Sequence, residues 1–113
     1  MRLAVVMLSG CMVFGCATSG PNIDVGNDPN LRAVLNGWDR CTTFAALNEA
    51  STEKTAEDGA DAAMALCRDE EARFAKVLSE TKIAPQDAAA LEQSERKNMR
   101  DQKVALILGW RNR

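Results

Sequence analysis

Apolar residues between positions 29 and 50 recur at steps of three and four, which places them on one face of an α-helix. Asp28 can accept hydrogen bonds from the free N–H groups at a helix start, and Pro29 suits the first helical position. The pattern therefore predicts a helix that begins at Pro29 and ends near Ala50. Its apolar face comprises Leu31, Val34, Leu35, Trp38, Cys41, Phe44, Ala45 and Leu47.

A second apolar stripe runs through residues 53–79, which contain no proline and a single glycine, Gly59. A hydroxyl residue (Ser51, Thr52 or Thr55) can cap its start. These features predict one continuous helix over residues 53–79. Its apolar face comprises Ala60, Ala63, Met64, Cys67, Phe74 and Leu78.

A turn over residues 81–87 contains Pro85, again at the start of a helical pattern. The third predicted helix has Met99 as its only large apolar residue between Glu92 and Lys103. This half-polar middle either packs loosely on the first two helices or awaits a partner. Residues 104–108 are apolar on all sides, so part of this segment should be buried. The apolar positions of the third helix are Ala88, Leu91, Met99, Leu106 and Trp110.

Cys41 and Cys67 lie on the apolar stripes of the first two predicted helices. The short connection at residues 50–55 makes these helices antiparallel, and the two cysteines stand at similar distances from it. We therefore predict a Cys41–Cys67 disulfide; two buried free thiols would require a reducing compartment. Two cysteines without histidine form at most half a zinc site. The predicted fold is all-α: a small antiparallel helical hairpin or three-helix bundle with one interhelix disulfide.

Glu70 and Glu71 occupy positions where the second apolar stripe should continue after Cys67. Such a pair usually forms a solvated shoulder of a helix. The alternative is that one of the two carboxylates lies near the disulfide.

The composition of the chain indicates that its stability depends strongly on the disulfide. Hydrophobic residues form 46% of the 113-residue chain, but aromatic residues form only 4% and many of the others are alanines. Alanine buries little area, so the sequence predicts one small domain with a thin core. Such domains usually need a covalent staple, a metal or a partner.

The N-terminus has the layout of an export signal: one positive charge at Arg2, apolar residues over positions 3–14, then Gly15 and Cys16. The apolar run is too short to span a bilayer comfortably. The segment resembles a bacterial lipoprotein signal peptide, in which a small residue precedes a cysteine. The resemblance implies that the Cys16 thiol carries a diacylglyceryl group and that Cys16 becomes the new N-terminus.

Cys11 closes a competing cleavage box, Leu8-Ser9-Gly10-Cys11, which matches the family pattern better because Phe14 is bulky. Cleavage there leaves a signal of ten residues and an unpaired Cys16, whereas cleavage before Cys16 leaves one even pair of cysteines. A start codon further upstream would restore Cys11, and an ordinary secretory signal without lipid is a further alternative. We favour a signal peptide at 1–15, a lipid-anchored tether at 16–28 and a helical domain at 29–113. A tether of that length and composition spans about 20 Å.

Catalytic chemistry is not indicated. The chain has no histidine, so nucleophile–histidine pairs are excluded. It has no glycine-rich phosphate loop, and its carboxylates lie on alanine-rich helices without an aromatic groove. We therefore predict no catalytic residue, no cofactor and no metal site.

Charge is unevenly distributed although the net charge is only −2. Residues 49–71 are mainly acidic and residues 96–113 mainly basic. Arg96, Arg100 and Lys103 share one helical face. They either pair with the acidic second helix or contact anionic lipid headgroups. Nucleic-acid binding is not expected, because the compartment is unsuitable and interleaved aromatic residues are lacking.

The spacing of Trp38, Cys41, the Ala60-Asp61-Ala62-Ala63 run and Cys67 resembles that of small exported bacterial helical proteins of unassigned role. The predicted function is a non-enzymatic envelope lipoprotein, a helical interaction or structural module with a protein partner in the envelope. It would be held by its lipid on the periplasmic side of a membrane. The outer membrane is slightly favoured, because Ala17 is not an acidic retention signal. The alternative is a soluble periplasmic or secreted helical binder, such as an inhibitor of an envelope enzyme.

Overall fold

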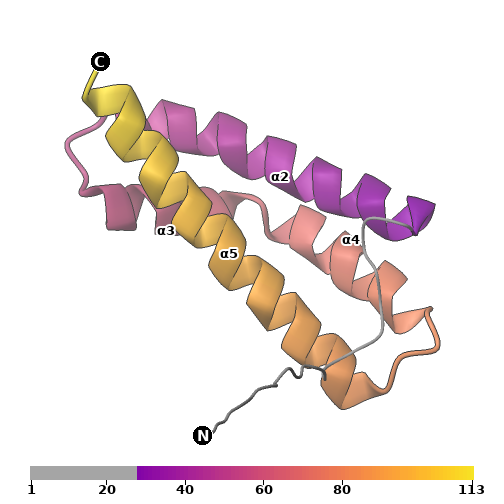
Figure 1. Cartoon of the computed structure of the whole chain (residues 1–113). Coiled ribbons are helices and arrows are strands. Elements are labelled where there is room, and N and C mark those ends of the chain that lie inside the picture. The colour runs from indigo at the N-terminus through magenta and orange to yellow at the C-terminus, as the bar shows by residue number, and fades with distance from the viewer. Residues whose placement is uncertain (1–27) are drawn as a thin grey trace, which may run out of the picture.

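The computed structural model describes residues 28–113. This part of the chain is built from helices and contains no strand, so the all-α prediction is confirmed. The predicted signal segment with Cys11, the predicted lipidation site Cys16 and the predicted tether up to residue 27 lie outside the described residues. The helices in Figure 1 are α2 (Pro29–Ala50), α3 (Ala56–Leu66), α4 (Arg68–Ser79) and α5 (Pro85–Arg111).

The predicted start of α2 is confirmed. The Asp28 carboxylate accepts hydrogen bonds from the backbone N–H groups of Asn30 at 2.9 Å and Leu31 at 3.1 Å. These bonds satisfy two of the donors that a helix start leaves free. Pro29 occupies the first helical position, and the helix ends at Ala50 as expected.

The prediction of one continuous helix over residues 53–79 is wrong. The helix begins only at Ala56, where the Thr55 hydroxyl accepts a hydrogen bond from the Asp58 N–H at 3.0 Å. It is interrupted at Cys67, whose φ of −109° and ψ of 29° lie outside the α region. No proline or glycine stands at the break, but the disulfide holds Cys67 toward α2. The three acidic residues in the first turn of α4 suit a new helix N-terminus.

The four helices pack so that α2 contacts all of the other three, and α5 also contacts α3 and α4. Figure 1 shows α3 and α4 returning one after the other along α2, and α5 crossing back over them. The C-terminal ends of α2 and α5 consequently lie at the same end of the molecule. The described part therefore has four helices in place of the three predicted.

The core is thin, as the composition suggests. Trp38 of α2 and Phe74 of α4 are fully buried, with ring centroids 5.6 Å apart. Much of the remaining core is alanine. Gly59 allows a close approach of two helices, because a Cβ there would lie 3.0 Å from the Ile107 side chain. Burial of Ile107 also confirms that part of the apolar segment 104–108 is covered.

No helix between residues 28 and 113 combines the length and the apolar character needed to cross a bilayer.

Candidate functional site around the Cys41–Cys67 bridge and the charged side of α5

The Cys41 and Cys67 sulfur atoms are 2.06 Å apart and the Cα atoms 5.9 Å apart, so the predicted disulfide is confirmed. Cys41 comes from the middle of α2 and is half-buried, whereas Cys67 is fully buried at the break between α3 and α4. The bridge therefore joins α2 to both halves of the predicted second helix. A reagent from solvent meets the Cys41 side first.

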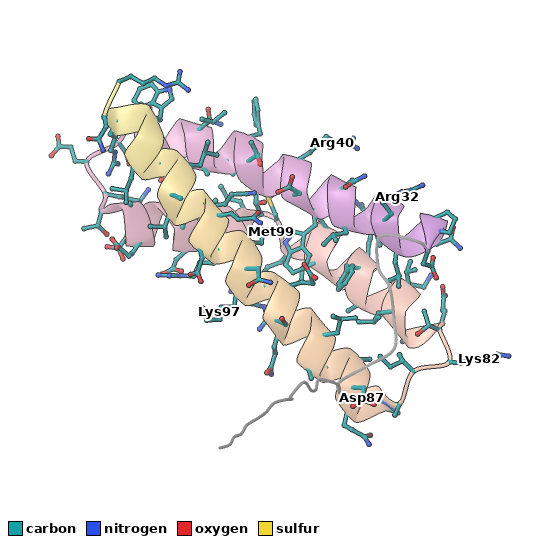
Figure 2. All side chains as sticks on the ribbon, viewed as in Figure 1. Arg32, Arg40, Lys82, Asp87, Lys97 and Met99 are labelled. Carbon is teal, nitrogen blue, oxygen red and sulfur yellow. A yellow bond between two sulfur atoms is a disulfide. The ribbon has the colours of Figure 1, made fainter. Side chains whose placement is uncertain are left out.

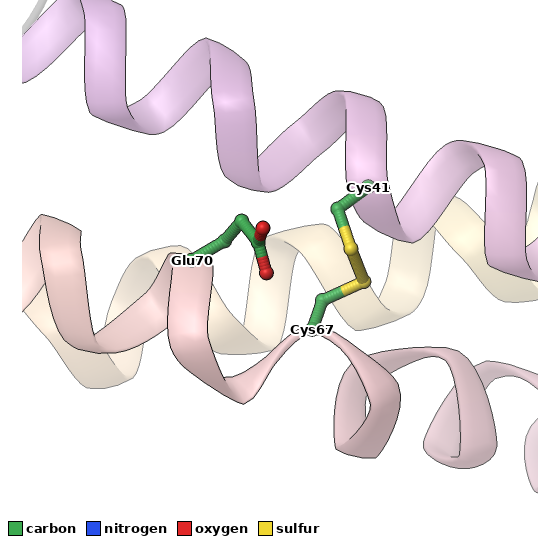
Figure 3. Close-up of side chains that lie close together, drawn as sticks. All are labelled: Cys41, Cys67 and Glu70. Carbon is green, nitrogen blue, oxygen red and sulfur yellow. A yellow bond between two sulfur atoms is a disulfide. The ribbon is translucent and has the colours of Figure 1, made fainter.

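Glu70 lies beside the bridge (Figure 3). One of its carboxylate oxygens is within 4.8 Å of both sulfur atoms. On its other side, Arg73 donates a hydrogen bond to Glu70 at 3.4 Å. Glu71 instead faces α5, so the two adjacent carboxylates have different surroundings. Sulfur atoms bonded to each other offer no thiolate, so this cluster is not a metal site while the disulfide is intact.

We expect Glu70→Gln to speed reduction of the bridge by a thiolate such as dithiothreitol. The carboxylate repels both the attacking and the leaving thiolate. The repulsion between two unit charges 4 Å apart in water is about 1 kcal/mol, and removing it corresponds to roughly a fivefold increase in rate. The measurement is the rate of thiol release above pH 8.

Asp69→Asn, at an exposed neighbouring position, is the matched control and should leave the rate unchanged. With an uncharged phosphine the difference between wild type and Glu70→Gln should be smaller, since the attacking reagent brings no negative charge and only the leaving thiolate is repelled. Equal rates with the thiolate would show that the Glu70 charge does not protect the bridge.

Arg96 and Arg100 pair with the acidic helices, which was one of the two predicted alternatives. Arg96 binds Glu71 of α4 through its Nε at 2.7 Å, and also binds Glu92 one turn away. Arg100 binds Asp61 of α3 through its Nε at 2.7 Å. These ion pairs hold the half-polar middle of α5 against α3 and α4.

Lys103 does not belong to a surface strip. Its side chain is only 4% exposed and its ammonium group binds Asp39 of α2. Contact with a lipid headgroup would require the ammonium to leave this carboxylate. The Asp39–Lys103 pair was not predicted, because 64 positions separate the two residues.

An open groove of about 560 Å³ lies where α3, α4 and α5 meet. Glu71 and Glu92 line it and share Arg96 as their counter-ion. Burial, followed by the hydrogen bond and repulsion from Glu71, raises the pKa of Glu92 above its ordinary value. The Glu71 hydrogen bond raises the pKa of Arg96, so the guanidinium stays charged. The groove is thus charged, and Glu71, Glu92 and Arg96 pair with one another along its wall.

Arg111 was predicted only as part of the basic C-terminal segment, and the structure gives it a definite role. It donates hydrogen bonds to the Ala50 carbonyl at 3.0 Å and the Thr52 carbonyl at 3.1 Å. A cation at a helix C-terminus satisfies free carbonyl groups and complements the helix dipole. Arg111 in the last turn of α5 therefore caps the C-terminus of α2.

No protein-family model, curated protein or solved structure matches this chain. Its function must therefore be inferred from its own residues. Within the described residues, the most distinctive features are the Cys41–Cys67 bridge with its flanking Glu70 and the ion-paired side of α5.

Proposed function

We propose that this chain is a non-enzymatic lipoprotein of the bacterial cell envelope, anchored through a lipid on Cys16. The domain after the tether is a small interaction or structural module. In it, α3 and α4 together form a second helical segment, bent at Cys67 and antiparallel to α2, and α5 packs against both to complete a bundle. We place it on the periplasmic side, with the outer membrane slightly favoured.

The Cys41–Cys67 bridge is the observation that supports this proposal most. Stable disulfides form in oxidising compartments, which agrees with the export signal that we predict from the sequence. The bridge also consumes both cysteines of the helical domain, so Cys16 has no partner there. A cysteine directly after a short apolar segment and Gly15 is then free for lipid attachment.

A non-enzymatic role is supported by the absence of histidine and by the ion pairs that engage the half-buried carboxylates. The chain has no histidine. The half-buried carboxylates Glu71 and Glu92 bind Arg96, and Asp39 binds Lys103. These charged groups are therefore engaged in holding helices together, which is the role expected of a structural or interaction module.

Cys16→Ala is expected to abolish membrane association. In a bacterial host, the wild-type chain should sediment with membranes and carry an acylated Cys16 as its mature N-terminus. Cys16→Ala should not be acylated, because the thiol that receives the lipid is gone. Fractionation combined with mass spectrometry of the mature N-terminus measures both effects.

Cys11→Ala is the matched control and should fractionate like wild type, because Cys11 is removed with the signal. Loss of acylation in Cys11→Ala would show that Cys11, and not Cys16, is the residue that carries the lipid. A soluble wild-type protein with an unmodified mature N-terminus would contradict lipid anchoring and favour the alternative, a soluble periplasmic or secreted binder.

A further inference from the structure

The outer face of α2 carries Phe44, the most exposed large apolar side chain among the described residues. Its residues follow one another at alternating steps of four and three, so they form a straight stripe. Phe44 in this stripe is 71% exposed and Leu47 is 37% exposed. Trp38, on the opposite side of the helix, is fully buried. The stripe, called the α2 outer face below, consists of Ala33, Gly37, Arg40, Phe44 and Leu47.

The α2 outer face has a positive charge and no carboxylate. The two acidic residues of α2 are engaged elsewhere, Asp39 with Lys103 and Glu49 with Lys54. The side chain of Arg40 is exposed and forms no ion pair within residues 28–113. Figure 2 shows Arg32 and Arg40 projecting from α2 away from the other helices.

The α2 outer face differs from the other helix surfaces in combining an exposed aromatic ring with a cation and no carboxylate. Leu66 of α3 is exposed to a similar degree as Phe44, but the exposed charged residues of α3 are all acidic, and like charges repel an anionic surface. α4 exposes cations but no large apolar side chain. Leu108 and Trp110 of α5 are less exposed than Phe44, and Arg111 beside them is bound to a backbone carbonyl at the end of α2. The exposed acidic residues of α3 are Glu57, Asp58 and Asp61.

We propose that the α2 outer face rests on an anionic membrane surface, with Phe44 entering the headgroup region and Arg40 meeting a lipid phosphate. A helix face that combines an apolar side chain with cations is suited to the membrane interface. This inference rests on the proposed function, since one Phe, one Leu and few cations bind weakly by themselves. A lipid on Cys16 would make the contact intramolecular, because only 12 residues separate Cys16 from Pro29.

A second helix fits the face less well. Ala33 and Gly37 are small, and nothing lies within 4 Å of a Cβ placed on Gly37, so a helix could approach there. Arg40, however, stands in the middle of the stripe. A helix covering it would bury its charge without a carboxylate from this chain, whereas at a bilayer the guanidinium stays among headgroups.

The test compares Phe44→Trp with Leu66→Trp in the full chain purified from the bacterial host. Leu66 is the matched control, because it is 69% exposed but lies on α3. In vesicles containing phosphatidylglycerol and brominated lipid, we expect the indole at position 44 to lose fluorescence and the indole at position 66 to keep it. Trp38 and Trp110 contribute the same background to both chains.

Adding Arg40→Gln to Phe44→Trp should reduce the docked population roughly fivefold, since each cation near an anionic surface favours binding by a similar factor. Equal quenching at positions 44 and 66, or none at either, would overturn the proposal. A blue shift of the indole at position 44 that depends on protein concentration and not on lipid would also overturn it, in favour of a second helix.

Mass spectrometry of the same samples separates this inference from the proposed function. If Cys16 carries no lipid, the anchoring proposal fails, and the vesicle measurement still decides whether the α2 outer face binds. If Cys16 is acylated and the indole at position 44 is not quenched, anchoring holds and the docking proposal fails.

Discussion

Phe74→Ala is expected to lower the free energy of unfolding by about 3–5 kcal/mol. Phe74 is fully buried and its ring lies 5.6 Å from that of Trp38. The substitution leaves a cavity at the main contact between α4 and α2, in a core otherwise rich in alanine. Small domains are stable by about 5–15 kcal/mol, so this loss should shift the urea midpoint strongly. Circular dichroism during urea unfolding measures it.

Phe44→Ala is the matched control because it removes the same side chain from an exposed position. Its ring is 71% exposed, so the loss should stay within about 0.5 kcal/mol. Similar urea midpoints for Phe74→Ala and Phe44→Ala would mean that the Trp38–Phe74 contact does not hold α4 in place.

The helices and most of their ends could be predicted because their determinants are local. Asp28 with Pro29, and Pro85, each mark a helix start within a few residues of sequence. The break at Cys67 could not be predicted in this way, since Asp69, Glu70 and Glu71 suit a helix N-terminus but are also tolerated on an exposed helix surface. The break falls on the residue that is linked covalently to Cys41, and that link is a tertiary constraint that local patterns do not show.

The bridge itself could be predicted, because two cysteines equidistant from a short connection meet in antiparallel helices. Which of the two adjacent carboxylates lies beside it could not. That choice depends on how the non-helical Cys67 turns α4 relative to α3. The Asp39–Lys103 pair could not be predicted from the sequence either, because it depends on the path of α5 across α2.

Replacing both bridge residues, as Cys41→Ala with Cys67→Ala, is expected to lower the free energy of unfolding by about 3.5 kcal/mol. The bridge closes a loop with a sequence separation of 26, and losing such a loop gives the unfolded chain this much entropy on the chain-entropy model. Urea unfolding monitored by circular dichroism measures the loss.

Cys16→Ala replaces a cysteine outside the helical domain, leaves the bridge intact and should not change the midpoint. Wild-type protein reduced with a dithiol should unfold at the same urea concentration as the double variant, because both lose the same constraint. If the double variant kept the wild-type midpoint, the helices would be held together by packing alone. The thin core, with Trp38 and Phe74 as its largest members, makes that outcome physically difficult.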